Sequence, residues 1–149
     1  MSKEFDESNP IRNVIPMRST QTLFLLLACF LTQPARCSEL LDGEIESDLV
    51  PSPVAYSVLL PDGYMQDAKP FPLLLLLHGG SGDREDLRHW RVTLDRLWNS
   101  GQFPKVVAVM PNVTAHCQYV DTKDGLEKWE SFLIGPIFQH LRDQYNVSR

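Results

Sequence analysis

A glycine-rich turn at residues 77–83 is the part of this 149-residue sequence that most directly suggests chemistry. It reads Leu-His-Gly-Gly-Ser-Gly-Asp and lies between an apolar run and a segment with helical spacing. The adjacent glycines Gly79 and Gly80 let backbone N–H groups approach a ligand closely, and the N-terminus of a following helix favours negative charge. Such a turn can hold an oxyanion, although a plain connection between a strand and a helix has the same composition.

The other uses of glycine-rich turns do not fit this sequence. A phosphate-binding loop would continue with Gly-Lys-Ser/Thr, and a dinucleotide fold would carry GxGxxG; both patterns are absent. We expect His78 to be a structural histidine rather than a catalytic one, because it follows a strand with no nucleophile partner near it in sequence. The turn is therefore a candidate for anion stabilisation, not for nucleotide binding.

No metal or cofactor is expected from the remaining polar residues. The histidines His89, His116 and His140 do not have the spacing of zinc ligands. Asp121 and Asp124 could suggest calcium, but the ligand series of an EF-hand is lacking, so a solvated acidic loop is the better interpretation.

Strand and helix patterns alternate around the turn. Residues 54–60 and 106–110 have the composition of strands, and 71–77 is a continuous apolar run typical of a strand buried on both faces of a parallel sheet. The first predicted helix has Asp83 as its N-cap and ends before Gly101, and its apolar face carries Leu87, Trp90, Leu94, Leu97 and Trp98. A second helical segment, interrupted at Gly135-Pro136, has on one face Trp129, Phe132, Leu133, Ile137, Leu141 and Tyr145. This order predicts an α/β domain in which helices flank a mostly parallel sheet.

Composition excludes several classes of protein. With 43% hydrophobic residues the chain is globular, and its three cysteines cannot form a disulfide framework. A net charge of -5 without a run of Lys or Arg argues against binding to nucleic acid or to an anionic membrane.

The N-terminal segment has the pattern of a secretory signal peptide at residues 17–37. Its apolar run, 23–31, is too short to span a bilayer, and Ala35 and Cys37 fit the small-x-small pattern of a cleavage site before Ser38. Alternatives are a lipoprotein box at Cys29 or a buried helix. Residues 1–16 would then be a polar extension or an upstream start, and 38–149 the folded domain. We expect a secreted or extracytoplasmic protein without a stable membrane anchor.

Taken together, the segments of the domain resemble an esterase family of α/β hydrolases that includes S-formylglutathione hydrolases, feruloyl and other carbohydrate esterases, and mycolyltransferases. The resemblance lies in the order and spacing of VAYSVLLPDGY (54–64), FPLLLLLHGGSG (71–82), Trp90, VAVMPN (107–112), Tyr119-Val120-Asp121 and WESFL (129–133). It implies a serine nucleophile in a GxSxG elbow, with an acidic residue and a histidine later in the chain, acting on a small ester. It also implies that the backbone N–H of Gly80 faces the oxyanion and that Gly79 frees the turn. Tyr119 would line the acyl or alcohol pocket, or would be a surface aromatic.

The sequence departs from the family pattern because no GxSxG occurs in it; Ser81 is followed by Gly82 and Asp83. The family's elbow would come shortly after Tyr145, so the nucleophile, acid and base are expected beyond Arg149. The sequence thus predicts the N-terminal half of an α/β-hydrolase fold, inactive by itself. The alternative is a noncatalytic secreted fragment or binding module of the same fold.

Overall fold

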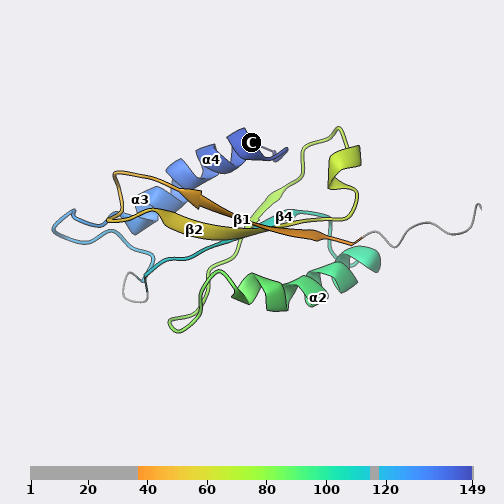
Figure 1. The fold of residues 1–149 in the computed structure, drawn as a ribbon, viewed down its shortest axis with the longest axis horizontal. Coiled ribbons are helices and arrows are strands. Elements are labelled where there is room, and N and C mark those ends of the chain that lie inside the picture. Colours follow the sequence, from red (N-terminus) through yellow and green to blue (C-terminus); the bar gives the residue numbers. More distant parts are fainter. Residues whose placement is uncertain (1–36, 115–117, 149) are drawn as a thin grey trace, which may run out of the picture. The chain divides into compact units, whose positions relative to one another are not determined.

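The computed structural model describes residues 37–114 and 118–148. They form three layers, in which a four-stranded sheet has helix α2 (Asp86–Asn99) on one face and helices α3 (Trp129–Ile134) and α4 (Pro136–Gln144) on the other (Figure 1). This confirms the predicted α/β fold class. The expected signal segment lies outside the described residues except for Cys37, which is exposed. None of the described helices is long and apolar enough to cross a membrane.

The sheet is mixed rather than mostly parallel. Its strand order is β1-β2-β4-β3, with β1 at Glu39–Ile45, β2 at Val54–Leu60, β3 at Leu73–Leu75 and β4 at Val107–Pro111. The pairs β1–β2 and β2–β4 are antiparallel, and only β3–β4 is parallel. Parallel strands need a long crossover connection, and among the described elements α2 supplies one, between β3 and β4. A short 3-10 helix, η1 (Tyr64–Gln66), lies between β2 and β3.

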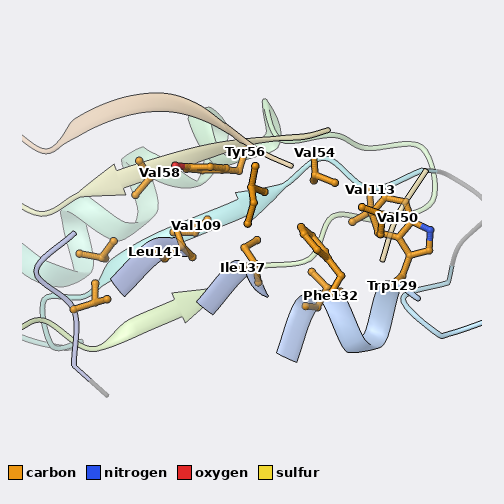
Figure 2. Packing of buried hydrophobic residues seen from close by; sticks show 14 of the residues in the cluster. Val50, Val54, Tyr56, Val58, Val109, Val113, Trp129, Phe132, Ile137 and Leu141 are labelled. Atoms are coloured by element: carbon orange, nitrogen blue, oxygen red, sulfur yellow. The ribbon is translucent and has the colours of Figure 1, made fainter. Parts of the chain in front are cut away.

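Alternating side chains of the two central strands pack against opposite helix layers. The side chains that face α3 and α4 belong to one buried cluster, part of which Figure 2 shows: Val54, Tyr56, Val58, Leu60, Val107 and Val109. Side chains between them in the sequence belong to a second buried cluster, on the face covered by α2: Leu59, Ala108 and Met110. Because both faces are covered, both strands read as continuous apolar runs. The two strands predicted at 54–60 and 106–110 are therefore confirmed, the second with a shift of one residue.

Strand β3 is shorter and more exposed than its sequence suggests. Only Leu73–Leu75 form the strand, these three leucines are half-buried, and Leu77 is 47% exposed. The prediction that 71–77 is buried on both faces is wrong for the described chain. The reason is that β3 lies at the edge of the sheet, with β4 as its one neighbouring strand there.

Helix α2 begins later than predicted, and one of its aromatics is not in the core. Leu87, Leu94 and Trp98 are buried, whereas Trp90 is 50% exposed. Asp83 lies outside the helix, and its carboxylate accepts a hydrogen bond from the N–H of Glu85 at 2.7 Å. Asp83 thus organises the turn before α2 instead of capping its first residue.

Strand β1 was not predicted from the sequence ELLDGEI. Its polar residues face solvent at the edge of the sheet, so the apolar periodicity is weak. Asp42 connects this strand to its neighbours: it accepts a hydrogen bond from the Ser57 hydroxyl at 2.7 Å and forms ion pairs with Arg84 at 2.8 Å and Arg88 at 3.3 Å. Beside Glu85, the pKa of the Arg88 guanidinium is raised. The edge strand is therefore tied to the segment that leads into α2.

A carboxylate outside α3 organises its first turn. Asp121 accepts hydrogen bonds from the Ser131 N–H at 3.0 Å and the Ser131 hydroxyl at 2.6 Å, and these bonds lower the pKa of Asp121 below its ordinary value. Asp124 similarly accepts from the Thr122 hydroxyl and the Leu126 N–H, and its pKa is also lowered. Both aspartates thus hold the loop before α3 in place through hydrogen bonds.

Replacing Gly43 by alanine is expected to destabilise the sheet. Gly43 lies opposite Tyr56, and an added Cβ would come within 2.4 Å of the Tyr56 ring, which is buried and hydrogen-bonded to His140. Because overpacking of this kind forces side chains or backbone to shift, we expect a loss of about 1–3 kcal/mol in the free energy of unfolding, measured by urea titration. Glu44→Ala, at the neighbouring exposed position, is the control. Equal stability of the Gly43 and Glu44 variants would contradict this account.

The carboxylate of Asp121 is expected to stabilise the fold in a pH-dependent way. Its pKa in the folded state is below the ordinary pKa of an aspartate, so its contribution to stability is present above that ordinary pKa and is lost as the pH falls through the lower folded pKa. Urea titrations at a series of pH values should therefore give a shallower acid limb for Asp121→Asn than for the parent chain. Asp48→Asn, at an exposed carboxylate, is the control substitution. Identical acid limbs for the parent and Asp121→Asn would refute a stabilising role for the hydrogen bonds between Asp121 and Ser131.

Candidate functional site

The parallel pairing of β3 and β4 brings the candidate turn next to a second loop. Both strands end at the same edge of the sheet, the edge at which open α/β sheets usually bind ligands. The turn 77–83 follows β3, and the loop that starts at Asn112 follows β4. A cavity of about 170 Å³ lies between them, lined by His78, Gly79 and Gly80 from the turn and by Val113, Thr114, Gln118 and Tyr119 from the loop.

Hydrogen bonding closes the turn on itself. The Gly82 N–H donates to the Gly79 carbonyl at 2.9 Å. A side chain at position 82 would crowd the turn, because its Cβ would come within 3.1 Å of the His78 Cβ and closer still to the Asp86 carboxylate. Glycine at position 82 therefore allows the turn between β3 and α2 to pass close to His78 and Asp86.

The two adjacent glycines are exposed and open toward solvent. A Cβ added at Gly79 or Gly80 would meet no atom within 4 Å. The N–H of Gly80 has no hydrogen-bond partner among the described residues, and both glycines line the cavity. The turn thus contains a backbone N–H without a partner among the described residues, and it leads into α2, a 14-residue helix whose dipole favours negative charge at its N-terminus.

His78 is buried, at 7% exposure, and the backbone uses both of its ring nitrogens. Nδ1 lies 2.8 Å from the Gly79 carbonyl oxygen, and Nε2 accepts a hydrogen bond from the Val113 N–H at 3.3 Å. A histidine bound in this way does not serve as a general base for a neighbouring hydroxyl. The geometry agrees with the expectation of a structural histidine.

Tyr119 approaches the turn from the other side of the cavity. Its hydroxyl donates a hydrogen bond to the His78 carbonyl at 2.5 Å, and the two rings lie 6.0 Å apart in an edge-on arrangement. Gln118 and Tyr119 both have positive φ, 46° and 59°, a conformation that is uncommon for residues other than glycine. Strained backbone of this kind is often found at functional sites. Nothing in the sequence signals this conformation, because glycine and asparagine are absent from both positions.

The described residues do not form a catalytic triad. Ser81 is exposed, and neither a histidine nor a carboxylate in the described chain forms a hydrogen bond with it. The described residues also include no group of three or more His, Cys, Asp or Glu side chains that could hold a metal ion. His116 and Cys117 lie outside the described residues. What the structure brings together is thus a backbone donor, a buried histidine and a tyrosine around one cavity.

Comparison with solved structures finds similar folds among ester hydrolases. A ferulic acid esterase matches at 27% identity with a TM-score of 0.66, over 75% of this chain and 46% of its own length. A CE1 ferulic acid esterase from Anaeromyces mucronatus, solved in complex with ferulic acid, matches at 18% identity and a TM-score of 0.61, over 78% of this chain and 46% of its own. An S-formylglutathione hydrolase from Agrobacterium tumefaciens gives 13% identity and a TM-score of 0.62, with coverages of 78% and 47%.

Neither a family model nor a curated protein sequence matches this chain. The chain spans about half the length of the solved structures that it resembles. The resemblance inferred from the sequence motifs is confirmed by these structures. Over its described residues the chain has the fold of the α/β hydrolases, and its structural neighbours are feruloyl esterases, an S-formylglutathione hydrolase and related serine hydrolases.

Proposed function

We propose that this chain is the N-terminal part of a secreted, serine-type carboxylic-ester hydrolase. The observation that carries the proposal is the Gly80 N–H, which has no partner among the described residues and belongs to a glycine that lines the cavity at the ligand-binding edge of the sheet. In ester hydrolysis a nucleophile adds to the ester carbonyl, and negative charge develops on its oxygen. A preorganised N–H donor stabilises that charge in the transition state more than in the substrate.

The remaining residues of the cavity would bind the substrate. Gly79 leaves space beside the donor, because a Cβ at this position meets nothing within 4 Å. Tyr119 also lines the cavity, and its hydroxyl donates a hydrogen bond to the His78 carbonyl. The substrate class that this supports is a small carboxylic ester, and a neighbour of this fold has been solved with ferulic acid.

The nucleophile, the acid and the base would come from a part of the protein that is not in this sequence. Residues 146–148 provide structural support. The Phe71 N–H donates to the Asn146 carbonyl at 2.9 Å, and the Ser148 N–H donates to the Phe71 carbonyl at 2.8 Å, which makes a parallel bridge between Phe71 and Val147. The chain after α4 therefore starts to pair in parallel with the segment that leads into β3.

The backbone of β3 is oriented to continue this pairing. The Pro72 carbonyl and the Leu76 N–H bond to β4, so the intervening odd-numbered residues, Leu73 and Leu75, direct their N–H and C=O groups to the opposite edge. No described strand pairs with β3 on that edge, so these groups have no backbone partner among the described residues. A further strand on this edge would run toward Gly79 and Gly80, and a nucleophile at its end would lie beside the proposed oxyanion donor.

Export is the second part of the proposal. The support comes from the composition of residues 17–37 and from the position of β1, which begins at Glu39, just after the proposed cleavage point. Cleavage before Ser38 would leave every described strand and helix intact. N-terminal sequencing of the exported product tests this: Ser38 is expected as the first residue, and a product that still contains Phe24 would contradict it.

The 149-residue chain by itself is expected not to hydrolyse esters. It contains no GxSxG, and Ser81 is exposed, with no histidine or carboxylate of the described residues in hydrogen-bond contact with it. Serine needs such a base to be an effective nucleophile. The purified chain should therefore give no turnover of p-nitrophenyl acetate above the buffer rate. Turnover that Ser81→Ala abolishes would show that the nucleophile has been misplaced.

A chain that continues through a GxSxG elbow should hydrolyse the same ester and depend on the Gly80 N–H. Gly80→Pro removes the donor and fixes φ, and we expect it to lower kcat by about 100- to 1,000-fold. Gly80→Ala keeps the donor and has free space for its Cβ, so it should lose much less. Circular dichroism and thermal melts control for folding. Parental turnover by a folded Pro variant would remove the oxyanion role from Gly80.

A further inference from the structure

The hydrogen bonds of His78 determine which of its nitrogens carries the proton. A backbone carbonyl can only accept a hydrogen bond, so the contact between Nδ1 and the Gly79 oxygen requires a proton on Nδ1. A backbone N–H can only donate, so the contact between the Val113 N–H and Nε2 requires a free lone pair on Nε2. The buried ring is therefore neutral and in the Nδ1–H tautomer, because adding a proton to Nε2 would break the Val113 hydrogen bond.

One of these bonds also determines the direction of the Gly80 N–H. The peptide between Gly79 and Gly80 is planar and trans, so the Gly80 N–H points away from the Gly79 carbonyl. That carbonyl is held by two donors, His78 Nδ1 at 2.8 Å and the Gly82 N–H at 2.9 Å. A peptide between two glycines has little steric resistance to rotation, since neither residue has a Cβ. The hydrogen bonds to the carbonyl are then the main restraint on this peptide.

We propose that His78 is a positioning residue that holds the Gly79–Gly80 peptide with the Gly80 N–H available to the cavity. This inference rests on the proposed function, since it explains how the oxyanion donor is kept in place. Two hydrogen bonds from the loop after β4 hold His78 in place. The Val113 N–H donates to the ring Nε2, and the Tyr119 hydroxyl donates to the His78 carbonyl. Through His78, the two sides of the cavity are thus joined in a single hydrogen-bonded unit.

Two substitutions separate the two bonds of the ring. In His78→Asn the amide nitrogen occupies about the place of Nδ1 and can still donate to the Gly79 carbonyl, but nothing reaches Val113. In His78→Gln the longer side chain can bring its amide oxygen near the place of Nε2 and accept from Val113, while the Gly79 carbonyl loses its side-chain donor. His78→Leu has a similar size and makes neither bond. Leaving the Val113 N–H unpaired in the interior should lower stability.

The first measurement uses the present chain. Nitrogen-15 NMR of the His78 ring should show a protonated Nδ1 and an unprotonated Nε2, and crystal structures of the variants should show the Gly79–Gly80 peptide retained in His78→Asn and rotated in His78→Gln and His78→Leu. A proton on Nε2, or an unrotated peptide in all three variants, would overturn the proposal. Neither the NMR spectrum nor the crystal structures depend on esterase activity. They therefore test the positioning role of His78 even if the proposed function is wrong.

The second measurement uses the chain that continues through a GxSxG elbow, with a p-nitrophenyl ester as substrate. We expect His78→Gln and His78→Leu to lower kcat by about 10- to 100-fold with little change in KM, as for removal of part of an oxyanion donor. His78→Asn should keep kcat within about threefold of the parent although it is the less stable of the two amide variants. A merely structural role predicts that activity follows thermal stability, so losses in that order would overturn the proposal.

Discussion

The parallel pairing of β3 and β4 is the constraint on which the candidate site depends. Three register pairs, Leu73–Val107, Leu74–Ala108 and Leu75–Val109, place the ends of the two strands at one edge of the sheet. Helix α2 makes this pairing possible, because it returns the chain across the sheet and buries Leu87, Leu94 and Trp98 against the strands. Without that register the turn after β3 and the loop after β4 would not meet, and the cavity between them would not exist.

Within this sheet, a small number of hydrogen bonds hold the glycine-rich turn in one conformation. Glycines at 79, 80 and 82 make the turn possible but also free it to adopt other conformations. The bonds to the Gly79 carbonyl and to both sides of His78 remove much of that freedom. Preorganisation of this kind matters for catalysis, because a donor that is already oriented needs no rearrangement as charge develops. The positive φ of Gln118 and Tyr119 shows that the opposite loop is also held in an unfavourable conformation.

The sequence predicted those parts of the fold in which local patterns and tertiary packing agree. Strand β2, strand β4 and the break between α3 and α4 at Gly135 were found because apolar periodicity and a proline mark them clearly. Strand β1 was missed because the charged residues of this edge strand weaken the alternation of apolar and polar residues. Strand β3 was expected to be buried because an apolar run does not reveal how many neighbouring strands it has. Within the site, the Gly-Gly turn was visible from composition, whereas the contacts of Val113 and Tyr119 depend on residues that are 35 and 41 positions from His78.

The proposed catalytic role of this turn is that the Gly80 N–H donates a hydrogen bond to the oxyanion of an ester-hydrolysis intermediate. The most direct measurement is a crystal structure of a chain that continues through a GxSxG elbow, inhibited by a phosphonate that mimics the tetrahedral intermediate. We expect the anionic phosphonate oxygen to lie in the cavity beside Tyr119, about 2.7–3.1 Å from the Gly80 nitrogen. A covalently bound phosphonate whose oxygen points away from the turn, with the Gly80 N–H bonded to water or to another part of the protein, would contradict it.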